Sequence, residues 1–297
     1  EYRKLVVQRY RLDHHELGVD GHAFAEALPR AVRHMEGPVP HGGCVTLMLL
    51  CDRLRSTSKV VLTGEGADEM FGGYLRYANW RKLAWQDHIA QWLPPSLLPP
   101  VWPFLGVRRR GGFDAAVYSS IYHDFPNMHR LFPGLVPRPG AREVASKRFS
   151  DFRDRLFASD QIGYLESLLV RQDKMSMAAS VEARVPFVHL PLARVVNRLP
   201  RAVRAPGGVT KPLLKRIADK YLDGRLIHRR KIGLWLPYDE WLSDDRGLGR
   251  YLDFLSAPDG RLRGYAKAGA LDQVVDRFRR GDRAELPSML TLVKVEM

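Results

Sequence analysis

The stretch VVLTGEGADEMFGGY, residues 60–74, decides the fold. It begins with a short β-branched run, passes through Gly64 and Gly66, and ends in a helix-like segment. A strand that leads through glycines into a helix is typical of an α/β sheet, where ligands collect at the carboxyl ends of the strands. Glycine loops that hold phosphate usually lack carboxylates, but this one carries Glu65 and Asp68. The stretch therefore predicts a ligand site whose carboxylates need an explanation.

Helices and strands are predicted to alternate on either side of this stretch. Apolar residues at three- and four-residue spacing predict helices over 5–12, 24–35 and 46–54, and short apolar runs predict strands over 14–19 and 59–62. Such alternation favours a parallel sheet in an α/β unit.

The sequence changes character after this unit. Residues 93–140 are rich in proline and glycine, and we expect them to form irregular connections. Beyond 141 the patterns are mostly helical and predict helices over 142–157, 162–177, 192–199 and 210–222. The predicted fold class is α/β, with a parallel-sheet unit over 1–80 and a mostly helical region over 141–297.

Composition indicates a globular protein in a reducing compartment. The 297 residues are 45% hydrophobic and 27% charged, enough to bury one large or two moderate cores. The apolar run at 44–51 is far shorter than the ~18 residues of a membrane span. Cys44 and Cys51 would lie ~10 Å apart on one helix, too far for a disulfide, and are expected in the core. We therefore expect a cytoplasmic protein without a membrane partner.

The net charge of +14 raises the question of a polyanionic partner. Residues 201–231 hold ten basic and two acidic side chains. Such a cluster attracts nucleic acid or a small polyanion such as a nucleoside triphosphate, unless it forms solvated helix faces. No helix-turn-helix, ribonucleoprotein or zinc-finger spacing is present, so nucleic-acid binding is the weakest interpretation.

Motifs in four segments resemble, in order, the synthetase domain of glutamine-dependent asparagine synthetases. The segments are VVLTGEGADEMFGGY, LVRQDKMSMAASVEARVPFVHLPL, GGVTKPLLKRI and RRKIGLWLPYDEWL, and the resemblance runs from Tyr2 to Met297. It implies an adenine nucleotide alpha hydrolase-like domain that uses ATP and Mg²⁺ to adenylate the aspartate side chain, which ammonia from glutamine then attacks. It also implies a cytoplasmic enzyme of asparagine biosynthesis, possible as a homodimer.

Other members of this superfamily amidate or cyclise different carboxylates, as β-lactam synthetases and cell-surface polysaccharide amidotransferases do. They remain alternatives for the substrate. Glu65 favours the asparagine synthetases, because β-lactam synthetases carry Tyr at that place.

The resemblance further implies parts that this sequence does not contain. Family members begin with a glutaminase domain whose first Cys is the nucleophile, followed by a strand that ends in a Ser-Gly-Gly-x-Asp-Ser pyrophosphatase loop. We therefore expect a partial domain, incomplete at both ends and inactive alone. An inactive ATP-binding protein and an enzyme completed by a second chain remain alternatives.

Residues of the first motif take their roles from the resemblance. Asp68 matches a magnesium ligand, and Glu65 matches the position needed to form the β-aspartyl-adenylate, where it could accept a proton from ammonia. Thr63 and Gly64 match an ATP contact, and Gly64 and Gly66 allow close backbone approach. The alternative is that the carboxylates only complement a helix dipole.

Later motifs supply cations. Lys211 matches the lysine that stabilises the charged transition state of amide formation. It stands near a helix start, where Pro212 fits the first turn and a nearby carboxylate or acidic ligand would compensate its charge. Arg171 and Lys174 are expected to approach phosphate, and Lys231 matches a lysine near pyrophosphate. The alternative for each lysine is a solvated surface position.

A few residues are expected to have supporting roles. Period-two spacing places Glu182 and Arg184 on one side of an extended segment, either as a structural ion pair or as organisers of the cleft. Met175 and Met177 are predicted to fill the core, and the histidines at 14 and 15 to pack structurally, since neither forms part of a metal motif.

Overall fold

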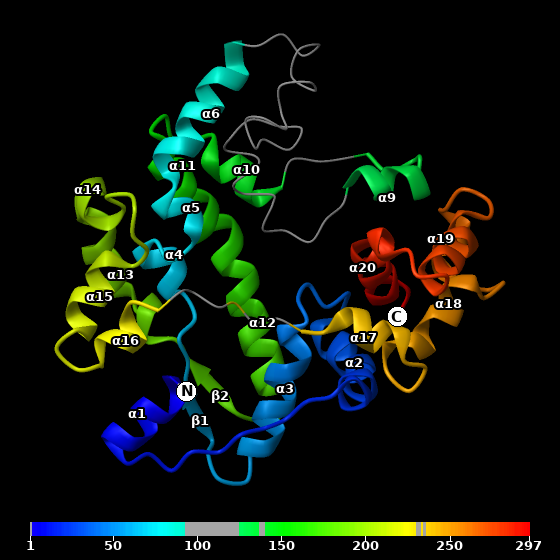
Figure 1. The fold of residues 1–297 in the computed structure, drawn as a ribbon, viewed down its shortest axis with the longest axis horizontal. Coiled ribbons are helices and arrows are strands. Elements are labelled where there is room, and N and C mark those ends of the chain that lie inside the picture. The colour runs from blue at the N-terminus through cyan, green and yellow to red at the C-terminus, as the bar shows by residue number, and fades with distance from the viewer. Residues whose placement is uncertain (1, 93–124, 137–139, 230–232, 234–235) are drawn as a thin grey trace.

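The computed structural model describes residues 2–92, 125–136, 140–229, 233 and 236–297 (Figure 1). Its first part consists of α1 (Tyr2–Tyr10), α2 (Gly21–Met35), α3 (Gly43–Leu54), β1 (Val60–Leu62), α4 (Ala67–Phe71), α5 (Leu75–Ala78) and α6 (Trp80–Trp92). Its middle part consists of α9 (Phe125–Leu131), α10 (Ala141–Ser146), α11 (Phe152–Ala158), the π-helical turn η1 (Ser159–Tyr164), α12 (Leu165–Met177), β2 (Glu182–Arg184) and the 3-10 turn η2 (Pro186–Val188).

The last part is helical throughout its regular elements. These are α13 (Leu190–Arg198), α14 (Arg201–Arg204), α15 (Pro212–Ala218), α16 (Gly224–Ile227), α17 (Tyr238–Ser243), η3 (Leu248–Tyr251), α18 (Leu252–Ser256), η4 (Arg261–Gly264), α19 (Ala270–Arg279), η5 (Arg283–Glu285) and α20 (Leu286–Glu296). The helical region predicted beyond 141 is therefore present.

A small parallel sheet joins distant parts of the chain. β1 pairs with β2, with Val61 opposite Ala183. The sheet predicted from the first motif is thus present. Its second strand comes from residues 180–187, SVEARVPF, in the second motif. The strand predicted over 14–19 was wrong: these residues are irregular and mostly exposed, and no strand of the described chain lies beside them. Without a partner strand their backbone groups have no ladder to join.

The main core lies between the N-terminal helices α2 and α3 and the C-terminal helices α17 to α20, on the right in Figure 1. Phe24, Leu28 and Ala31 repeat at helical spacing along α2 and are all buried, as predicted for an amphipathic helix. Asp20 caps α2 by accepting a hydrogen bond from the Ala23 amide at 2.8 Å. Cys44 and Cys51 are buried and unlinked, also as predicted.

The central helix α12 contacts α2 and α3 on the side of this core, and it also contacts β2 and the π-helical turn η1 (Figure 1). The helix predicted over 162–177 is present, but η1 precedes it as a π-helical turn. The helix predicted over 142–157 is divided into α10 and α11. It restarts because Asp151 accepts from the Arg153 amide at 2.9 Å and so caps α11.

Several smaller predictions failed. α9 lies inside the stretch predicted to be irregular, most of which falls outside the described residues. Met175 is buried, but Met177 is 52% exposed because it faces outward at the end of α12. His14 and His15 lie near carboxylates at the surface instead of packing inside. No helix in the described part of the chain is long and apolar enough to cross a membrane.

Candidate functional site

The site is built on the loop that follows β1. The Thr63 amide donates to the Arg184 carbonyl at 2.9 Å and so extends the strand pairing by one residue. Gly66 then turns the chain with φ of 85°, and a Cβ atom there would lie 2.4 Å from Val188 Cγ2. Only glycine satisfies both conditions. The turn leads directly into the short helix α4, so Glu65 on the loop and Asp68 in the first turn of α4 lie three residues apart.

Glu65 forms an ion pair with Arg171, which projects from α12. Both side chains are largely buried, with 26% and 11% of their surface exposed. Arg171 Nε is buried and has no partner within the described protein, so this guanidinium can still donate a hydrogen bond. Arg171 thus reaches the loop, where its partner in this structure is a carboxylate, and its approach to phosphate stays a prediction.

Asp68 forms an ion pair with Lys211, whose Nζ lies 3.0 Å from Asp68 Oδ1. Lys211 precedes α15 in a left-handed conformation, with φ of 50°, and its amide donates to the Gly72 carbonyl at 3.1 Å. Pro212 occupies the first turn, as predicted. The carboxylate expected near this lysine is thus Asp68.

Two buried polar atoms, one on Thr63 of the loop and one on Arg171, have no hydrogen-bond partner among the described residues. These atoms are Thr63 Oγ1 and Arg171 Nε. Gly64 is exposed, and a Cβ atom there would meet nothing within 4 Å. Because buried polar atoms are normally satisfied, an unpaired hydroxyl and an unpaired guanidinium nitrogen beside an open glycine fit a phosphate-bearing ligand such as ATP.

Asp68 is the magnesium ligand that the sequence predicts. The described residues contain no group of three or more His, Cys, Asp or Glu side chains that could hold a metal ion. Magnesium usually binds through one or two carboxylates together with substrate phosphates and water. A single partly exposed carboxylate beside a glycine loop fits that mode of binding, whereas a metal site made of protein ligands alone would need more carboxylates.

Glu69, next to Asp68, has a different environment. It is 1% exposed, and its carboxylate accepts a hydrogen bond from the Tyr74 hydroxyl. Burial raises the pKa of Glu69, because the charged form loses its hydration. Its position inside the protein separates it from Glu65 and Asp68, whose side chains are partly exposed.

Glu182 and Arg184 lie on the same side of β2, as predicted, and form an ion pair with a separation of 2.8 Å. Hydrogen bonding to Arg184 lowers the pKa of Glu182. Both side chains are more than half exposed. The geometry favours the structural ion pair of the two expected roles.

The basic residues of 201–231 do not form one uniform face. Arg201 pairs with Asp154, Arg225 with Asp223, and Arg204 is buried with its guanidinium 3.7 Å from the Phe157 ring centroid. Lys174 pairs with Glu36 and donates to the Met35 carbonyl at 3.0 Å, a contact to the end of α2, and its approach to phosphate stays a prediction. Lys231 lies outside the described residues.

The structure contains a buried charge network near α4 that the sequence did not predict. Asp160 of η1 is fully buried and accepts from Arg76 Nη2 at 2.6 Å, Arg142 Nη2 at 2.7 Å and the Tyr77 hydroxyl at 2.6 Å. The adjacent Gln161 donates to the Glu69 carbonyl at 3.1 Å. Local patterns could not reveal it, because its members are separated by as many as 84 residues.

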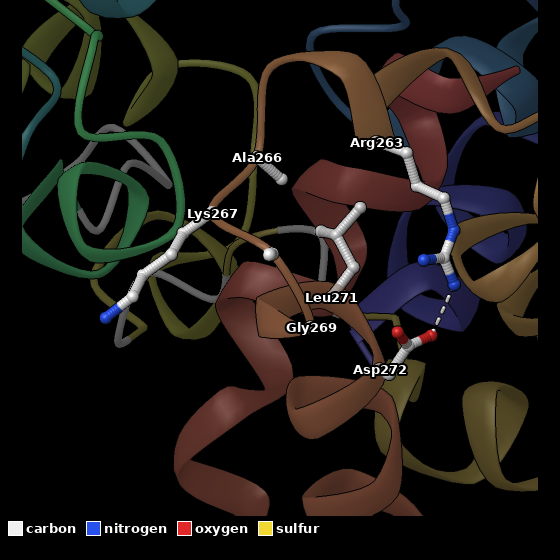
Figure 2. Close-up of a pocket in the computed structure, with 7 residues that line it drawn as sticks. Arg263, Ala266, Lys267, Gly269, Leu271 and Asp272 are labelled. Atoms are coloured by element: carbon white, nitrogen blue, oxygen red, sulfur yellow. Dashed lines mark hydrogen bonds and ion pairs between the residues drawn. The ribbon is translucent and has the colours of Figure 1, made fainter.

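A small cavity lies elsewhere, between η4 and the start of α19, at the opposite end of the molecule from α4 in Figure 1. Figure 2 shows Arg263 and Asp272 paired at its edge, with a separation of 2.6 Å, and Lys267 pointing away. Its volume of about 50 Å³ suits one or two water molecules and is far too small for a nucleotide. The loop after β1 remains the candidate site.

The chain is also similar to known proteins over most or all of its length. The family model described as asparagine synthase matches residues 1–297. One relative is a Mycobacterium tuberculosis protein with the provisional name asparagine synthetase [glutamine-hydrolyzing]. It is 29% identical to this chain over 239 residues, and the match covers 75% of this chain and 37% of that protein. Bacillus subtilis asparagine synthetases [glutamine-hydrolyzing] 1 and 3 are 26% and 25% identical, over 75% and 76% of this chain.

The alignments leave most of these relatives' length unmatched. The chain spans 38% of the first Bacillus subtilis protein and 34% of the second. The family model nevertheless covers every residue described above, including both ion pairs of the loop. The chain therefore belongs to the asparagine synthase family.

Proposed function

We propose that the protein containing this chain uses ATP to activate the side-chain carboxylate of aspartate and converts it to an amide with ammonia released from glutamine. Membership of the asparagine synthase family supports a ligase of this type. The observation that carries the proposal is the pairing of two loop carboxylates with cations from two distant elements, Glu65 with Arg171 and Asp68 with Lys211. A loop that only completed a helix dipole would need neither cation.

The phosphates of ATP would lie against the loop. Thr63 Oγ1 and Arg171 Nε are buried groups that can still bond to phosphate oxygens. The glycines at 64 and 66 let the backbone approach closely. We assign Lys231 to the pyrophosphate end from its place in the fourth motif.

Asp68 is proposed to hold the magnesium ion, which when bound would neutralise charge on the phosphates. Lys211 lies beside this carboxylate and is proposed to direct its ammonium toward the negative charge that develops on the reacting carboxyl group. A positioned cation of this kind stabilises the transition state more than the ground state.

Glu65 is proposed to accept a proton from the attacking ammonia. Arg171 orients its carboxylate through the ion pair, and orientation toward the reacting proton is what a general base requires. The Glu182–Arg184 pair is proposed to support the loop from behind, because the Arg184 carbonyl receives the Thr63 amide.

The test is an isotope-exchange assay on the longest natural polypeptide that contains these residues. Labelled pyrophosphate should enter ATP when aspartate is present, and added ammonia or glutamine should yield asparagine. Glutamate and a buffer without any carboxylate are the controls. Exchange that requires a carboxylate other than aspartate would overturn the assignment of the substrate. A protein that binds ATP without any exchange would overturn the proposed reaction.

A further inference from the structure

Helix α4, which carries Asp68, is too short to be stable by itself. It has five residues, whereas isolated helices shorter than ~12 residues are marginal in water. Its last carbonyl groups also lack partners within the helix and must find them elsewhere. The orientation of Asp68 therefore depends on contacts from outside α4.

Different segments supply these contacts. The Gly73 amide donates to the Asp68 carbonyl at 2.8 Å, and Arg204 Nη2 lies 3.4 Å from the Met70 carbonyl. Between them, Gln161 Nε2 donates to the Glu69 carbonyl at 3.1 Å. Gln161 thus caps α4 at Glu69, the residue that follows Asp68.

Gln161 is itself held firmly. Its Nε2 also donates to Asn197 Oδ1 at 3.1 Å, so both amide hydrogens are directed. Its neighbour Asp160 is fixed by Arg76, Arg142 and Tyr77 in the interior. A buried carboxylate with two guanidinium partners keeps one geometry, because breaking any pair leaves an uncompensated charge.

The π-helical turn η1 places Asp160 and Gln161 so that each can reach its own partners. Gly163 allows η1 to lie directly on α10, since a Cβ atom there would lie 2.6 Å from the Arg142 backbone. This close approach lets Arg142 reach Asp160 while Gln161 faces α4. Single π-helical turns of this kind occur frequently at functional sites.

We propose that Gln161 is a positioning residue, which transmits the fixed geometry of the Asp160 network to α4 and so aims the Asp68 carboxylate. The kinetic part of this proposal rests on the function proposed above. The structural part does not, because it concerns only the hydrogen bond between Gln161 and the Glu69 carbonyl.

The structural test is amide hydrogen exchange on the 297-residue chain. Gln161→Met keeps the length of the side chain and removes both N–H donors. Gln161→Glu also removes them at neutral pH, because an ionised carboxylate can only accept hydrogen bonds. Either variant should raise exchange at the Met70 and Gly73 amides by about fivefold, the effect of losing one ordinary hydrogen bond. Gln8→Met, the same change at an exposed glutamine of α1, is the matched control. Unchanged exchange in both Gln161 variants would overturn the proposal.

The kinetic test uses the longest natural polypeptide. Gln161→Met should lower kcat about tenfold, leave the KM for ATP within about twofold, and raise the Mg²⁺ concentration for half-maximal rate, because Asp68 is aimed less well. Gln8→Met should change none of these. A normal kcat despite faster exchange would show that Gln161 only stabilises α4 and would overturn its positioning role. If the wild-type protein makes no asparagine, the proposed function fails while the exchange result still decides whether Gln161 holds α4.

Discussion

Lys211 Nζ lies 3.0 Å from Asp68 Oδ1, and Gly73 lies directly against both side chains. The pair is partly exposed, with 30% of the Lys211 side chain and 26% of the Asp68 side chain accessible. Exposed pairs of this kind contribute little to stability. The contact instead holds the Lys211 ammonium next to the Asp68 carboxylate, which is proposed to bind magnesium, and bound substrates can separate the two.

Replacing Lys211 by methionine tests whether this lysine acts in catalysis. If its ammonium faces developing negative charge, Lys211→Met should lower the synthetase rate of the longest natural polypeptide by about a hundredfold, or roughly 3 kcal/mol. ATP affinity should stay nearly the same, and added salt should not restore activity. Lys220→Met, at an exposed position beyond α15, is the control and should have little effect. Equal and salt-sensitive losses in both variants would instead indicate a general electrostatic attraction.

Replacing Asp68 by asparagine separates metal binding from the contact with Lys211. The amide of the new side chain would still offer an oxygen to Lys211 but no negative charge to a cation. Asp68→Asn should therefore raise the Mg²⁺ concentration for half-maximal rate by at least about tenfold, with little change in thermal stability. Asp173→Asn, an exposed change on α12, is the control. An unchanged magnesium dependence would remove Asp68 from the metal site.

The sequence predicted the local parts of this site better than the long-range ones. The strand–glycine–helix pattern of 60–74 located the loop, since turn chemistry is local. The need of Lys211 for a nearby carboxylate also followed from its place at a helix start. Asp160 and Gln161 could not be identified, because their contacts to Arg76 and Glu69 depend on how distant segments pack. The strand expected over 14–19 failed for a similar reason, since a strand requires a partner that its own pattern does not specify.

Replacing Glu65 by glutamine tests the proposed proton acceptor. The amide oxygen of the new side chain can still accept a hydrogen bond from Arg171, so the loop should keep its shape. Glu65→Gln should spare ATP binding but lower amide formation by about a hundredfold, within the usual range for loss of a general base. Binding is measured by calorimetry and asparagine by chromatography. A rate within about twofold of the wild type would favour the dipole role for this carboxylate.

A methyl group at Gly73 should disturb the Lys211–Asp68 pair without unfolding the chain. A Cβ atom there would lie 1.7 Å from Asp68 Oδ1 and 2.3 Å from Lys211 Cε, and both are ends of side chains that can move aside. Gly73→Ala should therefore keep the melting temperature within a few degrees while lowering synthetase activity at least about tenfold. Gly134→Ala, where a Cβ atom meets nothing within 4 Å, is the control. Full activity in Gly73→Ala would show that the relative placement of Lys211 and Asp68 is unimportant.

His41, at the start of α3, should make the folded chain less stable in mild acid. Burial lowers the pKa of His41 from 6.5 to about 4, and the nearby charges of Arg171 and Lys294 act in the same direction. Between these two pKa values the unfolded chain binds more protons, so stability is present above pH 6.5 and is lost as the pH falls toward 4. From about pH 7.5 to about pH 5 this group should remove no more than about 2 kcal/mol from the free energy of unfolding.

Denaturant unfolding of the 297-residue chain at the two pH values measures this loss. Other groups titrate in the same range, so the variant His41→Asn is needed to isolate the effect. Asparagine can replace His41 Nδ1 as the acceptor for the Gly43 amide, which donates to it at 2.9 Å, but it cannot take up a proton. His41→Asn should therefore lose less stability between about pH 7.5 and about pH 5 than the wild type does. His15→Asn, at an exposed histidine, should follow the wild type. If all three proteins lose the same free energy, the protonation of His41 does not limit stability in acid.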